Sequence, residues 1–306
     1  MLSECVFLYG LWLAIMTPKK TGVLAILGAS SMWAVEPIFA KLAYANSDFL
    51  QTSAVRAVSV ALVAILYVLL RGQTNLKVTG RQFSHLVYLA LAGTIFGDLL
   101  YFYALTRIPV LNAVLIGHMQ PIFIVLMGFF LLKEDRLTKF DYAGIGTMIV
   151  AGVLVTTKTL ENLSAARLGT AGDVYVLLAT VAWATTSIVT RKYLRELDAG
   201  VVTFYRYVVA SAVFIGYLSL RSPLLLSNIY QIMVGVVVGA GTILYYEGLK
   251  RIKAAQVGAL ELSTPFFATL LAFLILGERV TAMQIAGLAL LLVGICFLSR
   301  KEEACF

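Results

Sequence analysis

Long apolar runs separated by short polar segments form the dominant pattern of the chain. A helix that crosses a bilayer needs about 20 mostly apolar residues. By that measure the sequence predicts an all-α polytopic membrane protein with ten transmembrane helices. The expected spans are Gly22–Ala43, Leu50–Leu70, Ser84–Leu105, Val110–Leu132, Tyr142–Thr157, Gly172–Tyr193, Val201–Leu220, Tyr230–Leu249, Ala255–Leu276 and Met283–Ser299.

Composition excludes a soluble domain. Of the 306 residues, 60% are hydrophobic and 13% are charged, whereas soluble domains carry about 25% charged residues. The net charge of +8 does not indicate nucleic-acid binding, because the basic residues cluster between the apolar runs. Membrane orientation explains them better.

The basic residues also predict the orientation. One set of alternate loops holds 16 of the 24 Lys and Arg residues and the other set holds 6, while Arg56 and Arg206 fall inside spans. Since cytoplasmic loops carry the excess of positive charge, we expect both termini in the cytoplasm and the protein in the cell (inner or plasma) membrane.

Residues 1–20 are expected to form an N-terminal extension. The stretch Met1–Met16 is apolar but too short to span a bilayer, and it lacks the basic start and cleavage site of a signal peptide. Two interpretations remain open: translation begins near Met16, or residues 1–15 lie at the membrane interface.

The two halves of the chain match each other, at residues 21–158 and 170–300. At an offset of 150, Trp33 pairs with Trp183, Lys41 with Arg191 and Arg56 with Arg206; at 144, Pro121 pairs with Pro265 and Glu134 with Glu278. Each half holds five expected spans. Because five is odd, the second half enters the membrane from the opposite side, as in the inverted repeats of secondary transporters. Channels, scramblases and inert scaffolds also arise by duplication and stay as alternatives.

Two related motifs carry a family resemblance. Gly277–Thr281 (Gly-Glu-Arg-Val-Thr) follows Pro265 and an apolar run, and Lys133–Thr138 is its counterpart in the first half. Together the duplicated motifs resemble the EamA-type family of the drug/metabolite transporter superfamily, over about residues 17–300. The resemblance implies ten helices, a central cavity and alternating access, with export of amino acids, other metabolites or drugs.

Acidic residues inside spans are functional candidates, because a charge in hydrocarbon is costly. The candidates for substrate or proton binding are Glu36, Asp98, Glu247 and Glu261, together with His118, Gln120, Trp33 and Tyr101. Helical rise places Glu36, Asp98 and His118 slightly outward of the midplane and the other two acids nearer the cytoplasm. The alternative is that these acids snorkel or are neutralised by arginine.

Three prolines inside spans, Pro37, Pro121 and Pro265, are expected to break helices at the cavity. Each removes an amide donor and frees the carbonyl four residues earlier. Those carbonyls lie beside or on Glu36, His118 and Glu261. The simpler interpretation is a kink that only shapes packing.

Other polar and small residues receive structural interpretations. We expect Arg56 and Arg206 to snorkel to the nearer surface, with recognition of a substrate carboxylate as the alternative. Glu134 and Glu278 lie at span ends as boundary or gate residues, and His85 is structural. Glycines two turns apart, Gly144 with Gly152 and Gly287 with Gly294, predict close packing of the fifth and tenth spans at the periphery.

The chain carries no signature of an enzyme or of a metal site. Its cysteines, Cys5, Cys296 and Cys305, show no metal or redox spacing, and no cofactor is expected. Gly97-Asp98 is only half of an intramembrane protease signature, and no HExxH motif or P-loop is present.

The sequence therefore predicts a secondary transporter that exports small polar metabolites, such as amino acids or amines, by alternating access and with proton coupling. Expected partners are a small-molecule substrate and membrane lipids but no nucleic acid, with the protein as a monomer or homodimer. A passive channel, facilitator or lipid scramblase without proton coupling is the alternative.

Overall fold

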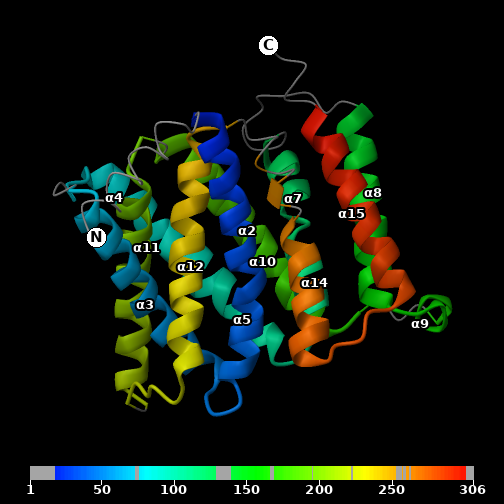
Figure 1. Ribbon diagram of the computed structural model, residues 1–306, viewed down its shortest axis with the longest axis horizontal. Coiled ribbons are helices and arrows are strands. Elements are labelled where there is room, and N and C mark those ends of the chain that lie inside the picture. The colour runs from blue at the N-terminus through cyan, green and yellow to red at the C-terminus, as the bar shows by residue number, and fades with distance from the viewer. Residues whose placement is uncertain are drawn as a thin grey trace, which may run out of the picture.

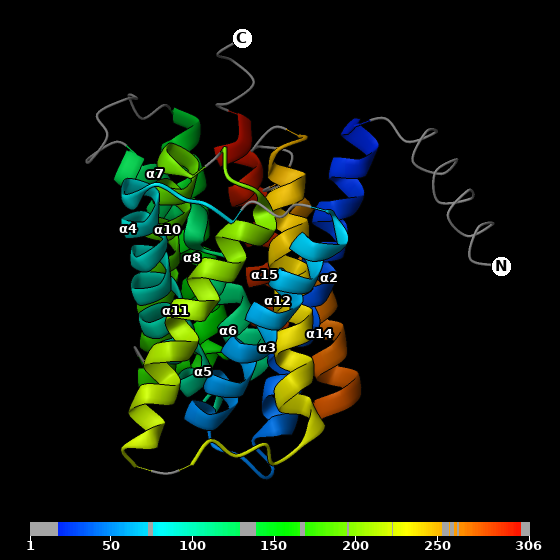
Figure 2. The ribbon, with the colours of Figure 1, turned by 90° about the vertical axis from the view of Figure 1, so that its left-hand side faces the viewer.

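The computed structural model describes residues 18–72, 76–128, 139–165, 169–194, 196–221, 223–252, 257, 260–261 and 263–300. Within these residues all regular structure is helical. The long helices run roughly alongside one another and form a bundle (Figures 1 and 2). The expectations for residues 1–15 and Met16 lie outside the described residues.

The helices follow the predicted spans closely. The first half contains α2 (Pro18–Ala43), α3 (Phe49–Leu70), α4 (Gly80–Tyr88), the π-helix η1 (Leu89–Asp98), α5 (Leu99–Leu105), α6 (Val110–Gly117), α7 (Gln120–Met127), α8 (Lys139–Thr157) and α9 (Leu160–Ser164). The second half contains α10 (Ala171–Tyr193), α11 (Ala199–Ser219), α12 (Ile229–Leu249), α14 (Ser263–Leu276) and α15 (Ala282–Arg300).

Eight helical segments in the described part of the chain are long and apolar enough to cross a membrane. The third of them, Gly80–Leu105, joins α4, η1 and α5, and the fourth, Val110–Met127, joins α6 and α7. The last two predicted spans correspond to the shorter apolar helices α14 and α15. The molecule is therefore a multi-pass, all-helical membrane protein.

The first helix of each half packs against helices of the other half. Helix α2 lies along α12 and α14, and α10 lies along η1, α5, α6 and α7. Figures 1 and 2 both show α2 beside α12. Glycines permit this approach: a Cβ on Gly22 would lie 2.7 Å from Ile252, and a Cβ on Gly172 would lie 2.5 Å from Ile108. The two halves are thus interleaved rather than placed side by side.

Helices α8 and α15 pair at one edge of the bundle, away from α3 and α11 (Figure 1). A Cβ on Gly294 would meet the Met148 side chain at 2.4 Å, and one on Gly287 would meet Val155 at 2.7 Å. Gly152 instead faces Met119. The expected close packing of these two helices is confirmed.

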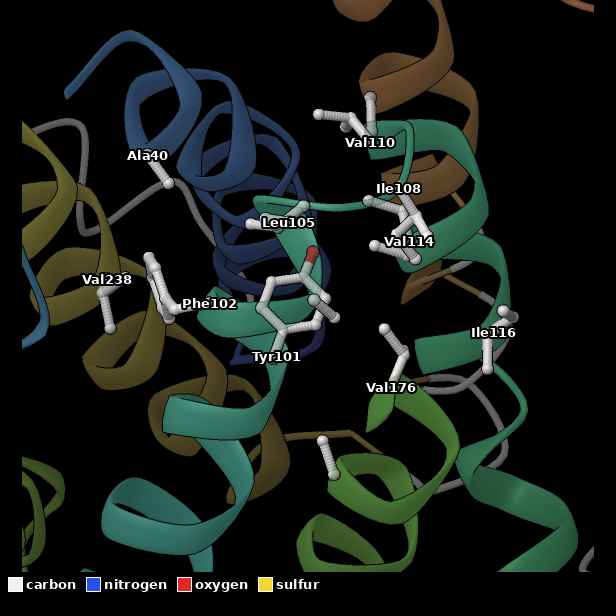
Figure 3. Close-up of a cluster of buried hydrophobic side chains, with 14 of the residues drawn as sticks. Ala40, Tyr101, Phe102, Leu105, Ile108, Val110, Val114, Ile116, Val176 and Val238 are labelled. Carbon is white, nitrogen blue, oxygen red and sulfur yellow. The ribbon is translucent and has the colours of Figure 1, made fainter. Parts of the chain in front are cut away.

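The apolar core lies where α5 and α6 meet α10 and α12. Figure 3 shows Tyr101 and Phe102 of α5 between Val238 of α12 and Val176 of α10. Phe102 is fully buried and Tyr101 nearly so. This packing fixes the end of η1, and with it Asp98, the last η1 residue.

The three prolines act differently from one another. Pro37 lies inside the unbroken helix α2, so the prediction that it breaks the helix is wrong. The buried ring is held by a 26-residue helix that packs along its length on α12 and α14. Pro121 does follow a break, because the predicted span stops at Gly117 and restarts as α7 at Gln120. Pro265 lies within α14, and Leu260 and Glu261 just before this element are also helical.

Candidate functional site

Four charged side chains from both halves meet inside the spans, and we call them the central network: Glu36, Arg56, Asp98 and Arg206. Arg56 donates to Asp98 Oδ2 at 2.7 Å through Nη2 and to Glu36 Oε1 at 3.3 Å through Nη1. Arg206 Nη2 lies 3.8 Å from the same Asp98 oxygen. The charges therefore alternate along a row: Arg206, Asp98, Arg56, Glu36.

Asp98 is held on both of its oxygens. The Trp183 indole donates to Oδ1 at 2.7 Å, and Arg56 donates to Oδ2. Trp183 comes close because Gly97 has no side chain: a Cβ there would lie 2.9 Å from the indole nitrogen. Asp98 also ends a π-helix, a feature that is frequent at functional sites. Its carboxylate is fixed between the two halves of the chain.

Arg56 is enclosed and does not snorkel, contrary to the prediction. Its side chain is 1% exposed and its guanidinium carbon lies 4.5 Å from the centre of the Phe102 ring. The Nε atom is buried without a hydrogen-bond partner among the described residues. Two carboxylates and an aromatic face offset part of the cost of burying this charge.

Arg206 also points inward rather than to the surface. Its Nε donates to the Thr94 hydroxyl at 2.8 Å, and its side chain is 12% exposed. Space for the guanidinium comes from Gly93, where a Cβ would lie 2.9 Å from Nη2. The prediction of snorkelling is therefore wrong for this residue as well, because Thr94 and Asp98 attract it to η1.

Glu36 is the most open acid of the network. Its side chain is 16% exposed, and its hydrogen bond from Arg56 is the longest in the network at 3.3 Å. The second oxygen, Oε2, accepts no hydrogen bond from the described residues and is not enclosed. Glu36 is thus the carboxylate best placed to exchange a proton or contact a ligand.

Four other candidate residues do not join the central network. Tyr101 packs on Trp183 with ring centres 5.3 Å apart. Gln120 donates to Ser187, one turn from Trp183 on α10. His118 bonds through Nδ1 only to the Val114 carbonyl of its own helix. Trp33 packs on Tyr245 of α12, at 5.0 Å between ring centres.

Glu247 belongs to a separate group at the predicted cytoplasmic end, which we call the inner cluster: Arg71, Asp198, Glu247 and Arg251. Arg71 Nη1 lies 3.2 Å from Glu247 and 3.8 Å from Asp198, and Arg251 pairs with Glu247 one turn away. The group ties the end of α3 to the start of α11 and the end of α12. It is an ionic contact between helix ends, apart from the central network.

Glu261 is not part of either group. It precedes α14, is partly buried, and forms no ion pair or hydrogen bond with the described residues. Its neighbour Leu260 accepts a hydrogen bond from Ser30 of α2 at 3.5 Å. Among the described residues, no group of three or more His, Cys, Asp or Glu is placed to hold a metal ion.

A further ion pair closes the predicted external end. Lys41 contacts Glu278 at 2.9 Å, and Glu278 also accepts from the amides of Val110 and Leu111 at the start of α6. A cavity of about 440 Å³ adjoins this pair, away from the central network; it is lined by Lys41, Tyr44, Ser47, Asp48, Phe49, Leu105 and Thr106. Burial raises the pKa of the Tyr44 phenol well above its usual range, and the phenol donates a hydrogen bond to the Phe102 carbonyl.

Comparison with family models decides what the helical scaffold is. The model of the EamA-like transporter family matches the chain twice, over residues 20–157 and 170–300. The chain belongs to this family. As an EamA-like protein it is a membrane transporter, and the names of its relatives are those of transporters rather than enzymes.

Individual relatives of this EamA-like transporter are distant. An uncharacterized transporter of Synechocystis sp. is 27% identical over 71% of this chain and 66% of its own length. A probable amino-acid metabolite efflux pump of Escherichia coli is 26% identical over 90% of this chain and 94% of its own. A protein known from a crystal structure shares the fold with a TM-score of 0.67 at 20% identity, covering 93% of this chain and 99% of that one.

Sequence reasoning missed two partners of the central network, Trp183 on Asp98 and Thr94 on Arg206. Trp183 was recognised only as the repeat counterpart of Trp33, and Thr94 was not singled out. The signal for Trp183 is Gly97 beside Asp98, since glycine next to an intramembrane acid marks a place where a bulky group approaches. The position of Thr94, four residues before Asp98, becomes meaningful only once η1 and α11 are known to touch.

Proposed function

We propose that this EamA-like protein is a secondary transporter that exports small polar metabolites, amino acids or amines, by alternating access across the cell membrane. The observation that carries the proposal is the central network. Four charged groups lie within the spans, supplied by α2, α3, η1 and α11. Intramembrane charges that face one another across a bundle are typical of substrate and ion pathways.

We further propose that the halves 21–158 and 170–300 are inverted repeats of five transmembrane helices each. Equivalent contacts support this arrangement. Gly22 packs on Ile252 as Gly172 packs on Ile108, and Trp183 lies against Gly97 as Trp33 lies against Gly241. Such repeats allow two conformations that expose one central site to either side in turn.

The substrate class follows from the polar site and from one relative. The network offers both acidic and basic groups, which suit amines and amino acids, and the Escherichia coli relative is named a probable amino-acid metabolite efflux pump. With the positive-inside bias, export starts from a cytoplasmic side that carries both termini. The protein works as a monomer or homodimer.

Proton coupling is assigned to Glu36 rather than Asp98. Both Asp98 oxygens already accept charged or indole donors, so protonation there breaks existing bonds. Glu36 has a free oxygen and one long bond, and it is able to trade a proton for a ligand at lower cost. Glu36 is therefore the proposed point at which proton and substrate compete.

The test is transport in proteoliposomes with a panel of labelled amino acids and amines, with and without an imposed pH gradient. Wild type is compared with Glu36→Gln and with Glu161→Gln, which makes the same change at an exposed position on α9. We expect gradient-driven accumulation by wild type and the control, and loss of that accumulation in Glu36→Gln.

Other outcomes separate the alternatives. Accumulation that ignores the gradient supports a facilitator in which the acids only contact substrate. Flux that does not saturate with the concentration of any compound, and that does not depend on the pH gradient, supports a channel. Absence of flux for the whole panel contradicts the proposed function.

A further inference from the structure

Arg206 presents unused hydrogen-bond donors within the membrane-spanning part of the molecule. A guanidinium has five N–H groups, and only Nε–H of Arg206 forms a hydrogen bond with the described residues, to Thr94. Nη2 approaches Asp98 at 3.8 Å, which is an ion pair but too long for a hydrogen bond. The terminal nitrogens are not enclosed.

Arg56 makes the contrast clear. Its two terminal nitrogens donate to Glu36 and Asp98, and its side chain is 1% exposed. It serves as the fixed counter-ion of the two acids. Of the two repeat-related arginines, only Arg206 has a partly exposed fork that is open to a ligand.

Glu36, at the other end of the row from Arg206, offers a free acceptor instead of free donors. Glu36 keeps Oε2 as a free acceptor on a side chain that is 16% exposed. Between the two ends, Arg56 and Asp98 neutralise each other at 2.7 Å. The network therefore has an electropositive pole at Arg206 and an electronegative pole at Glu36, with a paired middle.

We propose that Arg206 and Glu36 are the two specificity-determining poles of a site for a zwitterionic ligand, with Arg206 taking a carboxylate and Glu36 an ammonium group. The proposal rests on the proposed transport function and narrows its substrate class from amines and amino acids to compounds with both charged groups. A planar carboxylate matches the two-pronged guanidinium fork.

Ligands with one charge fit the site less well. A simple amine bound at Glu36 leaves the terminal donors of Arg206 without a ligand partner, which is costly where the ligand displaces water from them. A simple carboxylate bound at Arg206 lies close to Asp98, without an ammonium group to offset the repulsion between the two carboxylates. A zwitterion satisfies both poles and leaves the net charge of the site unchanged.

The experiment measures efflux from proteoliposomes loaded with an equimolar mixture of the twenty protein amino acids, or with the corresponding amino-acid amides, which lack the carboxylate. Mass spectrometry quantifies what leaves. We expect wild type to release amino acids in preference to amides. We expect Arg206→Gln to lower that preference at least about tenfold, the size of a charge-assisted hydrogen bond.

Arg206→Lys keeps the positive charge but removes the two-pronged guanidinium, so it tests whether the shape of that group matters. It is expected to retain the fold and to show a weakened preference for the carboxylate. Arg221→Gln, the same change at an exposed position just beyond α11, is the control and is expected to leave the preference unaltered.

A second variant tests the site without removing the arginine. In Gly93→Ala the new Cβ would lie 2.9 Å from Nη2, so the guanidinium must move while its charge remains. We expect the preference for amino acids over amides to fall. Gly216→Ala on α11, where nothing lies within 4 Å, is the matched control.

The outcomes distinguish this inference from the proposed function. A purely structural role of Arg206 lowers both fluxes equally and leaves the preference unchanged, which overturns the inference alone. Release of amides as readily as amino acids by wild type also overturns it while leaving a transporter. If neither mixture moves, the proposed function fails and the inference fails with it.

Discussion

Asp98 is the most heavily bonded carboxylate of the central network, and it forms the shorter of the two ion pairs of the buried Arg56. Asparagine at this position keeps the shape of the side chain but removes the negative charge that faces Arg56, whose side chain is only 1% exposed. We expect Asp98→Asn to lower the free energy of unfolding by about 3–5 kcal/mol, the cost of leaving one member of a buried pair. Denaturant titration in detergent micelles measures it.

Glu36→Gln is the informative comparison for that measurement. The bond of Glu36 to Arg56 is longer than that of Asp98, and the Glu36 side chain is more exposed. A smaller loss of stability is therefore expected. Exposed Glu161→Gln is expected to have no effect. Equal stability of Asp98→Asn and wild type contradicts the assignment of Asp98 as the fixed counter-ion.

At the residue scale, the sequence predicted which groups are costly in the membrane but not how they pair. Hydropathy and helical rise predict a depth for Glu36 and Asp98, since this prediction depends only on position along a span. Pairing depends on the rotation of each helix about its axis and on which helices touch. For that reason Arg56 and Arg206 were expected to snorkel, although both turn towards Asp98.

At the scale of helices, the inner cluster ties three helix ends together through Arg71. The chain offers a matched control, because Arg221 occupies the equivalent place in the second half. Arg71 stacks over Tyr67 and Arg221 over Tyr217, but Arg221 has no acidic partner among the described residues. The two arginines therefore differ mainly in their ion pairs.

We expect Arg71→Ala to loosen the end of α12. The loss of a partly exposed ion pair is worth up to about 1 kcal/mol, which raises local hydrogen exchange of the Lys250 and Ile252 amides roughly fivefold. Arg221→Ala should leave that exchange unchanged. Exchange that rises equally in both variants assigns the effect to lost stacking on tyrosine rather than to the ion pair.

The α8–α15 pair yields a prediction about packing. In Gly294→Ala the new Cβ would lie 2.4 Å from Met148 and 3.1 Å from the Gly144 carbonyl, so the helices must separate. Overpacking of this kind costs about 1–3 kcal/mol of unfolding free energy, measured by the same denaturant titration.

Gly146→Ala is the control for this substitution, since nothing lies within 4 Å of that position on α8. It is expected to leave stability unchanged or to raise it, because alanine favours helix. A Gly294→Ala variant as stable as Gly146→Ala contradicts the close approach of the two helices.

Helix positions were predictable because twenty apolar residues in a row have few alternatives in a bilayer. Breaks within helices were harder to place. Proline has the same local chemistry at Pro37 and Pro121, yet α2 continues through the first while the fourth span divides before the second. The π-helix at Leu89–Asp98 leaves no mark in hydropathy, because its residues are as apolar as those of an α-helix.

At the scale of the whole molecule, the repeat predicted which residues of the two halves are equivalent. It did not predict that equivalent residues pack against the opposite half. Gly22 and Gly172 are equivalent, and each packs on an isoleucine of the other half. Interleaving of this kind requires long-range contacts that no local pattern encodes. It also explains why the central network draws on both halves: α11 of the second half lies against η1 of the first.

The equal number of acids and arginines in the central network has an electrical consequence. Two carboxylates and two guanidinium groups sum to zero formal charge. Moving one elementary charge through 100 mV involves about 2.3 kcal/mol, but a neutral group of charges that shifts together does almost no work against the membrane potential. A zwitterion carried with it adds none. Under the proposed coupling, voltage acts on the central network only through a proton on Glu36, and the membrane potential then drives the movement of the coupling proton but not that of the zwitterion.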